Sequence, residues 1–331
     1  MVVSTQEKVG VDAGALCDRA TVGIAATDDV DGLIALKPEL LCYCASAVGR
    51  EEQAIEDIDR YLRSGINVVT MSTIPLVYPA AAPPGWRKTI ETAAREGNST
   101  FYATGSEPGF ASLNIPTALL TGAGRVDAYR MDLYAIRLDE QYPIWDVLHE
   151  SMGFGKPDGY VPARIAHGKV EDDWSTVVRY IADLLGFTLD RLDVDWETIL
   201  TPTELETAIG VIPAGTICGH RWQLAGKVDD QAVVSVQYFA AVSGTPWPER
   251  WTDPGRITGG MVYRVSGRPS MRMDFEFEEV AANNEVNPGI TATAMAVVNA
   301  IPCVIAADPG IVEQPLSGPS LVTRRAQVRQ A

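Results

Sequence analysis

Residues 40–70 read LLCYCASAVGREEQAIEDIDRYLRSGINVVT and contain a complete strand–helix–strand unit. The apolar run 40–46 is typical of a short strand that is buried on both faces. Apolar residues at helical spacing predict a helix over 51–64, and Gly65 provides its C-terminal stop. A second strand follows at 67–70. The pattern predicts two neighbouring parallel strands joined by a right-handed crossover.

The same unit continues up to about residue 125. A helix is predicted over 86–96, a strand over 100–104 and a helix over 111–120. Strands that alternate with helices indicate an α/β domain with a Rossmann-like parallel sheet.

Beyond that point, long strand-like runs replace the short buried ones. Helices are predicted only over 174–185 and near 291–300, apart from an aromatic loop or short helix at 142–155. Long alternating runs favour an antiparallel or mixed sheet with one open face. We therefore predict a first domain over 1–124, joined by 289–331, and a second, α+β domain over 125–288. The predicted strands of the second domain are 126–136, 193–200, 207–211, 218–225, 232–241, 258–265 and 270–278.

Small or polar residues follow each predicted parallel strand. Ligands of open parallel sheets bind beyond these carboxyl ends, and small residues let the backbone approach a nucleotide. Ordinary tight turns are the alternative explanation. The candidate cofactor-binding residues at these ends are Ser4, Thr5, Ala45, Ser46, Ser72, Thr73 and Gly105.

The glycine fingerprint of a dinucleotide fold, G-x-G-x-x-G after a first strand, is not found in the sequence. Gly122 and Gly124 follow a predicted helix, and Gly153 and Gly155 lie in a predicted loop. The chain opens on residues 1–5, MVVST, which are typical of the end of a second strand. We therefore expect the first strand, its glycine loop and its helix, about thirty residues, to be missing ahead of it, through a misassigned start codon or a real loss.

The tip of that second strand bears on the choice between NAD and NADP. An acidic residue at this tip would bind the ribose 2′-hydroxyl of NAD. The sequence offers Ser4, Thr5 and Lys8 instead, and these groups suit a 2′-phosphate. NADP is therefore slightly preferred, with a solvated Lys8 as the alternative.

Composition excludes several classes of function. The chain has 331 residues, of which 46% are hydrophobic and 21% charged, as in globular proteins. A formal net charge of −16 makes nucleic acid a poor partner. The sequence shows no apolar run of membrane-spanning length and no signal peptide. A cytoplasmic protein without a membrane partner is therefore expected.

The five cysteines fit no disulfide framework and no zinc site. Cys42 and Cys44 share one face of a predicted strand and are interpreted as small buried hydrophobic residues. Reduced thiols fit the cytosol. No cluster of histidine, cysteine and aspartate has the spacing of metal ligands, so no metal is predicted. No Gly-x-Ser-x-Gly motif is present, which argues against a hydrolase.

A series of short motifs runs in order along nearly the whole chain. The motifs are EKVG (7–10) with DAG (12–14), GINVV (65–69), YP (78–79), TG (104–105) with EPGF (107–110), MGFGKP (152–157), IPAGT (212–216), NAIP (299–302) and DPGI (308–311). Each is weak alone. In this order and spacing they resemble the actinobacterial dihydrodipicolinate-reductase-like proteins and the related 2,4-diaminopentanoate dehydrogenases and native amine dehydrogenases.

The resemblance implies a dinucleotide-binding first domain and a second domain that binds substrate and forms a homodimer. It also implies an NAD(P)H-dependent oxidoreductase that reduces a small carbonyl or imine, with reductive amination as one form of the reaction. A non-catalytic or degenerate dinucleotide-binding protein is the alternative.

The chain departs from these relatives at two points. The His-His-x-x-Lys motif of lysine-pathway reductases is absent, which argues against that role. The amine dehydrogenases carry a glutamate shortly before the Tyr-Pro pair, and this chain has Ile74 and Pro75 there, which hold no charge.

Two residues are candidates for managing the proton that accompanies hydride transfer. Glu107 follows a strand end and precedes a helix, so it either serves the site or caps that helix. A helix N-terminus lowers a carboxyl pKa, which favours an electrostatic or hydrogen-bonding role over a general acid. Tyr78 lies just beyond a strand end and can donate to a carbonyl oxygen or imine nitrogen. An anchored loop aromatic is the alternative for Tyr78.

Aromatic residues after position 140 predict an apolar substrate wall. Trp145 and His149 are one helical turn apart, so they can share a face. An interdomain core is the alternative, and His220, on a strand-like run, is interpreted as a structural histidine. The predicted wall consists of Tyr142, Trp145, His149, Met152 and Phe154.

Overall fold

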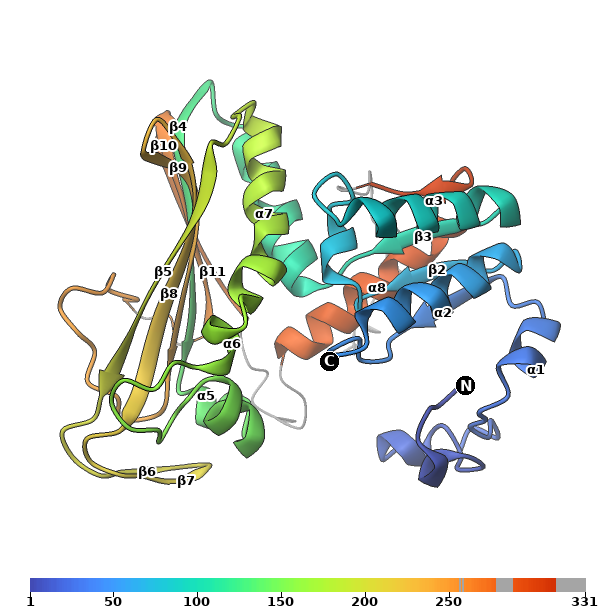
Figure 1. The fold of residues 1–331 in the computed structure, drawn as a ribbon, viewed down its shortest axis with the longest axis horizontal. Coiled ribbons are helices and arrows are strands. Elements are labelled where there is room, and N and C mark those ends of the chain that lie inside the picture. The colour runs from blue at the N-terminus through green and yellow to red at the C-terminus, as the bar shows by residue number, and fades with distance from the viewer. Residues whose placement is uncertain (256, 258, 278–287, 314–331) are drawn as a thin grey trace, which may run out of the picture.

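The structure is a computed structural model that describes residues 1–255, 257, 259–277 and 288–313. Within these residues the chain forms a four-stranded sheet, a six-stranded sheet and a two-stranded hairpin. Figure 1 shows the two larger sheets side by side, with the long helix α7 between them. The predicted combination of a Rossmann-like parallel sheet and a mixed sheet is confirmed.

The first sheet is parallel throughout, with the strand order β1-β2-β3-β12. Val68 and Phe101 pack in one core cluster with α2 and α3, whereas Val69 and Tyr102 pack against α8 on the opposite face. The elements of this unit are β1 (Leu40–Tyr43), α2 (Glu51–Arg63), β2 (Asn67–Thr70), η3 (Ile74–Val77), α3 (Pro84–Gly97), β3 (Thr100–Ala103), η4 (Ser106–Asn114), α4 (Ile115–Leu120), α8 (Pro288–Ala306) and β12 (Gly310–Ile311).

The strand β1 lies at the edge of the first sheet. Cys42 and Cys44 are exposed there, so the prediction that both are buried is wrong. The physical reason is the edge position: no strand of the described residues pairs with the outer side of β1, and α8 packs mainly on Val69 and Tyr102.

The start of the N-terminal segment lies apart from the first sheet (Figure 1), whereas Val30, Leu33 and Ile34 of α1 pack against the core of that unit. The predicted strand at its start is wrong, because Val2 forms only an isolated parallel bridge with Thr27. Asp12 organises the segment by accepting hydrogen bonds from the backbone N–H groups of Gly14, Val22, Gly23 and Ile24. Its helical elements are η1 (Gln6–Lys8), η2 (Ala15–Cys17) and α1 (Val30–Ala35).

The second sheet is mixed, in the order β11-β10-β4-β9-β8-β5. Only the β4–β9 pair is parallel. The predicted strand over 207–211 is instead the turn of the hairpin β6–β7, where Thr207 pairs with Gly210. The elements of this unit are β4 (Arg125–Ile136), α5 (Leu138–Gln141), η5 (Val147–Ser151), α6 (Ala163–Ala166), α7 (Lys169–Leu185), β5 (Arg191–Leu200), β6 (Leu205–Thr207), β7 (Gly210–Ile212), β8 (Ile217–Val228), β9 (Gln231–Ala241), β10 (Gly259–Arg268) and β11 (Met271–Glu276).

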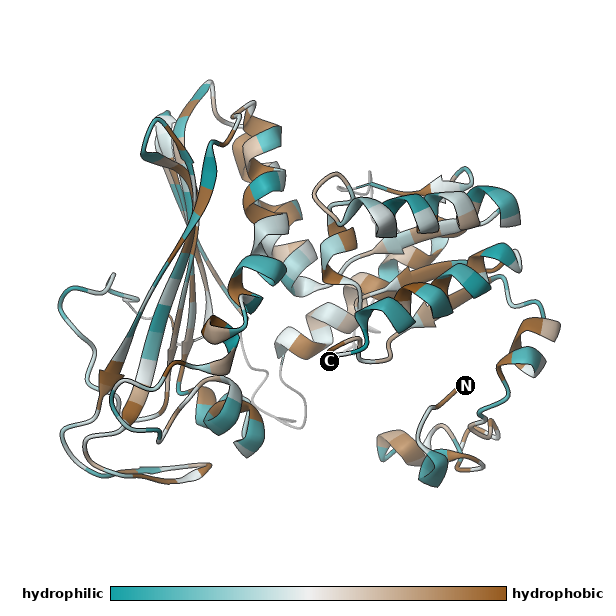
Figure 2. Ribbon diagram, in the orientation of Figure 1, coloured by the Kyte–Doolittle hydropathy of each residue, from teal (hydrophilic) through white to brown (hydrophobic). Residues whose placement is uncertain are grey.

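The two faces of the second sheet differ in chemistry because side chains alternate along each strand. We call the face that packs against α7 the inner face. It carries Trp222 and Leu224 of β8, and the ring of Trp222 lies 5.3 Å from that of Trp174 on α7. The opposite face carries ion pairs such as Arg221 with Glu197. Figure 2 shows brown and teal patches alternating along α7, as expected for a helix with one buried face.

Helix α8 is longer and more apolar than the sequence suggested. Among the described residues it is the one helix with the length and composition of a membrane span, with 19 residues and a mean hydropathy of 1.8. The prediction that no apolar run reaches that length is therefore wrong. The helix packs on the first sheet through Val297, Ala300 and Val304.

Candidate active site between the two sheets

A cleft of about 1070 Å³ opens between the carboxyl ends of the first sheet and the helices α6 and α7. We call it the central cleft. Ala47 follows β1, and Ser72 and Thr73 follow β2, on one wall. Arg164 of α6 and Thr176 of α7 lie on the other wall. The volume suits a small-molecule ligand, and the position is the one expected for a ligand of a parallel sheet.

Thr73 presents an unused polar group to the central cleft. Its side chain is 3% exposed, and its Oγ1 has no hydrogen-bond partner among the described residues. Neighbouring Ser72 is occupied, since its Oγ donates to the carbonyl oxygen of Tyr43 over 3.3 Å. A buried hydroxyl without a partner is costly, so Thr73 is a natural contact for a bound ligand.

The charged rim of the cleft joins the two units. Lys169, at the start of α7, lies 3.2 Å from the carboxylate of Glu51, at the start of α2. Arg164 has no hydrogen-bond or ion-pair partner among the described residues, although its charge acts on Asp173. Burial raises the pKa of Asp173, and Arg164 opposes that effect.

Glu107 is placed by the short loop that follows β3. The backbone at Glu107, Pro108 and Gly109 is not helical, so the regular part of η4 begins after them. The Oε1 atom of Glu107 is buried without a hydrogen-bond partner among the described residues. Burial raises the pKa of Glu107 to about 8.

This result corrects the expectation for Glu107. A lowered pKa requires backbone N–H groups that point at the carboxylate. Here Glu107 makes no capping hydrogen bond, the Gly109 N–H donates to Ser112, and the Phe110 N–H donates to Gly105. Desolvation therefore dominates, and it favours the neutral, protonated form of the Glu107 side chain.

The inner face carries a polar and aromatic cluster that the sequence-based interpretation did not assign to the site. Tyr238 of β9 is at its centre, with its ring 6.1 Å from that of His220 and 5.5 Å from that of Trp222. Burial raises the pKa of Tyr238 to about 12, and the nearby charges of Glu107 and Arg164 also act on it. The charges of Arg164 on the cleft wall and of Glu107 thus both act on this cluster, although neither Glu107 nor Tyr238 lines the central cleft.

Tyr78 lies outside the lining of the central cleft. Its hydroxyl donates to Asp183 on α7, and its ring meets the edge of Tyr180 at 5.4 Å. In the structure it joins the loop after β2 to α7, which is the alternative that the sequence left open.

The predicted substrate wall is divided by the fold. Tyr142 lines the cleft. Trp145 and His149 share a face as predicted, with stacked rings 4.4 Å apart, but outside the cleft lining. Met152 and Phe154 are buried in the core.

Only some of the predicted cofactor-binding residues line the central cleft. Ser72 and Thr73 line the cleft, whereas the other strand-end residues do not. All of these other residues except the buried Gly105 have exposed side chains. The residues outside the lining are Ser4, Thr5, Lys8, Ala45, Ser46 and Gly105.

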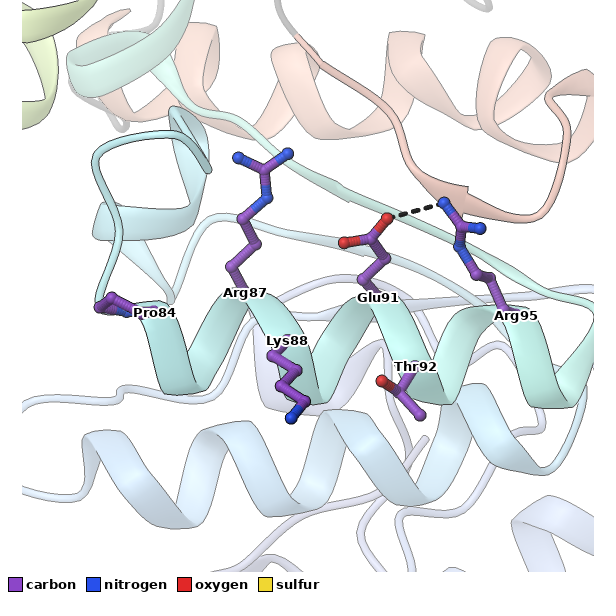
Figure 3. Close-up of a pocket in the computed structure, with 6 residues that line it drawn as sticks. All are labelled: Pro84, Arg87, Lys88, Glu91, Thr92 and Arg95. Atoms are coloured by element: carbon purple, nitrogen blue, oxygen red, sulfur yellow. Dashed lines mark hydrogen bonds and ion pairs between the residues drawn. The ribbon is translucent and has the colours of Figure 1, made fainter.

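A second hollow, of about 390 Å³, lies on the surface of α3. Figure 3 shows its six side chains on a single helix, with Arg95 paired to Glu91. Among the described residues only α3 lines this hollow, so the central cleft, which both units line, is the better candidate site. In the part of the chain that the structure describes, no three histidine, cysteine, aspartate or glutamate residues are grouped to hold a metal ion.

Comparison with known families bears on the same region. The family model described as the 2,4-diaminopentanoate dehydrogenase C-terminal domain matches residues 147–324, more than half of the chain. The chain belongs to this family. The match covers α6, α7 and the strands β8 and β9, which supply Arg164, His220 and Tyr238.

Two curated relatives extend the similarity to nearly the whole chain. An amine dehydrogenase of Streptomyces virginiae is 28% identical over 316 residues, which cover 94% of this chain and 86% of the relative. The 2,4-diaminopentanoate dehydrogenase of Acetoanaerobium sticklandii is 24% identical over 300 residues, which cover 89% and 77%.

A solved amine dehydrogenase structure from Mycobacterium smegmatis matches with a TM-score of 0.63 at 19% identity, over 93% of this chain and 85% of that one. This match shows a shared fold. Together with the family model and the curated relatives it confirms the predicted family, and the chain is an NAD(P)-dependent oxidoreductase.

The residues present at the cleft fit a nicotinamide dinucleotide. The orphaned hydroxyl of Thr73 can bond a ribose hydroxyl or a carboxamide, which carry both donors and acceptors. Ala47 and Ser72 are small enough to let a planar ring approach the strand ends.

Proposed function

We propose that this dehydrogenase reduces a small carbonyl or imine at the central cleft, with reductive amination as the favoured form, and that Glu107 delivers the proton. The observation that supports this role is the buried, unpartnered Oε1 of Glu107 beside the inner face. The named activities of the two curated relatives support the amine chemistry.

The chemistry of Glu107 suits a proton donor. With a pKa of about 8 the side chain is protonated at pH 7, so it can donate a hydrogen bond to a carbonyl oxygen or imine nitrogen. Transfer of that proton neutralises the charge that develops on the heteroatom during reduction.

Residues at the strand ends would hold the cofactor. Thr73 and Ala47 would contact the nicotinamide half, whose bound, reduced form supplies the hydride. Ile74 and Pro75 line the same wall and hold no charge, so neither can transfer a proton.

The test is the variant Glu107→Gln. We expect NADPH or NADH to bind the variant as it binds the wild type, measured by nucleotide fluorescence, while oxidation of the nucleotide with butan-2-one and ammonium falls by about 10²–10⁴-fold. Full activity in Glu107→Gln would remove the proposed acid. Nucleotide binding without turnover would favour the alternative, a non-catalytic dinucleotide-binding protein, and failure of the wild-type chain to bind either nucleotide would remove the proposed reduction altogether.

Three sequence-based expectations belong to this proposal. They are a slight preference for NADP, a homodimer formed through the second domain, and a cytoplasmic location. Nucleotide competition, light scattering and cell fractionation test them in turn.

A further inference from the structure

Helix α7 presents one face of charged and polar side chains to the central cleft. Lys169, Asp172, Asp173 and Thr176 all line the cleft, and their helical spacing places them on one face of α7. Lys169 is already paired, because its Nζ lies 3.2 Å from Glu51 Oε1 and 3.9 Å from Asp172 Oδ2. Of the two acids on this face, Asp172 therefore has a basic partner.

Asp173 is the acid on this face that the fold leaves unpaired. Its side chain is partly buried, and it makes no hydrogen bond or ion pair within the described residues. Burial raises the pKa of Asp173, whereas the charge of Arg164 lowers it and so favours the carboxylate. Arg164 lines the same cleft but forms no ion pair with Asp173. A partly buried carboxylate without a donor is costly, so it favours a ligand with positively charged N–H groups.

The balance of charge in the cleft lining also favours a cation. The described residues that line the cleft contribute three carboxylates and two basic groups, with histidine counted as neutral. This leaves an excess of one negative charge. The walls of a cleft focus such a charge and raise the local concentration of a ligand of opposite sign. The charged residues of the lining are Glu51, Asp172, Asp173, Arg164 and Lys169.

Thr73 is independent evidence that the cleft receives a ligand. It lines the wall formed by the first unit, its side chain is 3% exposed, and its Oγ1 has no partner among the described residues. Pro83, Tyr142 and Val147 line the same cleft and offer apolar surface. The cleft thus combines an unpaired carboxylate and an unpaired hydroxyl with room for a small alkyl group.

We propose that Asp173 binds the cationic nitrogen of the reaction in the central cleft, which is ammonium before the imine forms and the alkylammonium product after reduction. This inference rests on the proposed function and names the residue that recognises its nitrogen. The contact is a charge-assisted hydrogen bond from an N–H to a carboxylate oxygen, which a neutral ketone cannot make. Asp173 acts here as a binding residue, and no covalent bond forms or breaks at it.

The first experiment compares two variants of α7 that lose the same charge. Asp173→Asn keeps the shape of the side chain. Glu171→Gln is the control, because Glu171 is exposed on the same helix and outside the cleft lining. With butan-2-one as the ketone, we expect the KM for ammonium to rise about tenfold or more in Asp173→Asn and by less than about twofold in Glu171→Gln. Equal rises in the two variants, or no rise in Asp173→Asn, would overturn the proposal.

A structural role of Asp173 is tested with the same variants. Because Asp173 has no partner in the fold, the melting temperature of Asp173→Asn should match that of the wild type. Asp173→Glu restores a carboxylate and should recover part of the affinity for ammonium. A lowered melting temperature in Asp173→Asn, without recovery of the affinity in Asp173→Glu, would indicate a structural residue and contradict the proposal.

The second experiment needs no turnover. Butan-2-amine and butan-2-ol share a carbon skeleton, and the amine is a cation at pH 7. Calorimetric titration should show that the wild-type chain binds the amine about tenfold or more tightly than the alcohol, and that Asp173→Asn loses this preference. A wild-type chain without the preference, including one that binds neither compound, would overturn the proposal.

The two experiments separate the inference from the proposed function. If Glu107→Gln retains full activity while Asp173→Asn loses its preference for butan-2-amine, the proton donor is wrong and the nitrogen site stands. If Glu107→Gln is inactive while Asp173→Asn keeps the wild-type KM for ammonium, the acid stands and the nitrogen site is wrong.

Discussion

The carboxyl groups of Asp139 and Glu107 have very different surroundings in the fold. Asp139, in α5, is fully buried and accepts hydrogen bonds from the Ser243 N–H at 2.7 Å and the Ala208 N–H at 3.0 Å. Glu107, after β3, has a buried Oε1 atom with no partner among the described residues.

The difference separates a structural acid from a chemical one. Asp139 fastens α5 to the β6–β7 hairpin and to the loop after β9 with donors that the fold already provides. Glu107 is buried without such donors, so its environment favours the neutral, proton-carrying form. Burial alone does not identify a functional group; burial without partners does.

The largest expected effect is the loss of kcat when the carboxyl group of Glu107 is replaced by a neutral amide, compared with the same replacement at Asp139. Glu107→Gln should lower kcat by about 10²–10⁴-fold without loss of stability, whereas Asp139→Asn should leave the pH dependence of kcat unchanged. Stopped-flow turnover and thermal unfolding of both variants provide the measurement. A comparable loss of kcat in both would show that the distinction between the two acids is false.

The free energy of unfolding should show the reverse order, with the larger loss at Asp139 and the smaller loss at Glu107. Asp139→Ala leaves two backbone N–H groups without their acceptor, and we expect it to lower the free energy of unfolding by about 1–3 kcal/mol. Glu107→Ala leaves no donor unpaired and should cost less. Urea titrations of the two variants make the comparison, and a larger loss in Glu107→Ala would contradict it.

The pH dependence of the free energy of unfolding offers a further test of the environment of Glu107. The pKa of Glu107 is about 8 in the folded chain, against an ordinary value of 4.5. Below pH about 4.5 both folded and unfolded states hold the proton, and between pH 4.5 and 8 only the folded state does. Wild-type stability should therefore fall, relative to Glu107→Gln, as the pH rises through this window, by up to a few kcal/mol.

The kinetic counterpart follows from the same ionisation. Reduction requires the protonated acid, so kcat/KM for imine reduction should decrease above pH about 8. Oxidation of an amine requires the carboxylate and should increase over the same range. Parallel slopes in the two directions would count against Glu107 as the titrating group.

The smallest effect is expected at the rim. Lys169→Met removes the ion pair between Lys169 and Glu51. Because both side chains are partly exposed, the free energy of unfolding should change by less than about 1 kcal/mol. Because the pair joins the two walls of the cleft, the KM for the carbonyl substrate should change even though the free energy of unfolding hardly does. Titration of the melting temperature against salt checks the exposed character of the pair.

The elements were predictable from the sequence because each depends on local periodicity. The helix expected over 51–64 and the strand at 67–70 match α2 and β2 within one residue. Cys42 was misplaced because exposure at a sheet edge depends on which strands pair, and an apolar run does not report that.

The site was predictable only in part. Glu107 could be selected from its position after a strand, but its pKa depends on how deeply the folded chain buries it, which no local pattern reports. Asp173 was missed because the predicted helix began at 174, whereas α7 begins at Lys169. Whether its carboxylate finds a partner depends on how α6 and the first unit meet α7 at the cleft, which no local pattern reveals.

The order of the first sheet also affects how the chain is made on the ribosome. β12 pairs with β3, and α8 covers Val69 and Tyr102, although these partners are about 200 residues apart in the sequence. At a synthesis rate of about 5–20 residues per second, the apolar face of the nascent sheet waits on the order of 10–40 seconds for its cover. During that interval the growing chain exposes an apolar surface of the kind that chaperones bind. The speed of translation should therefore affect the yield of folded protein.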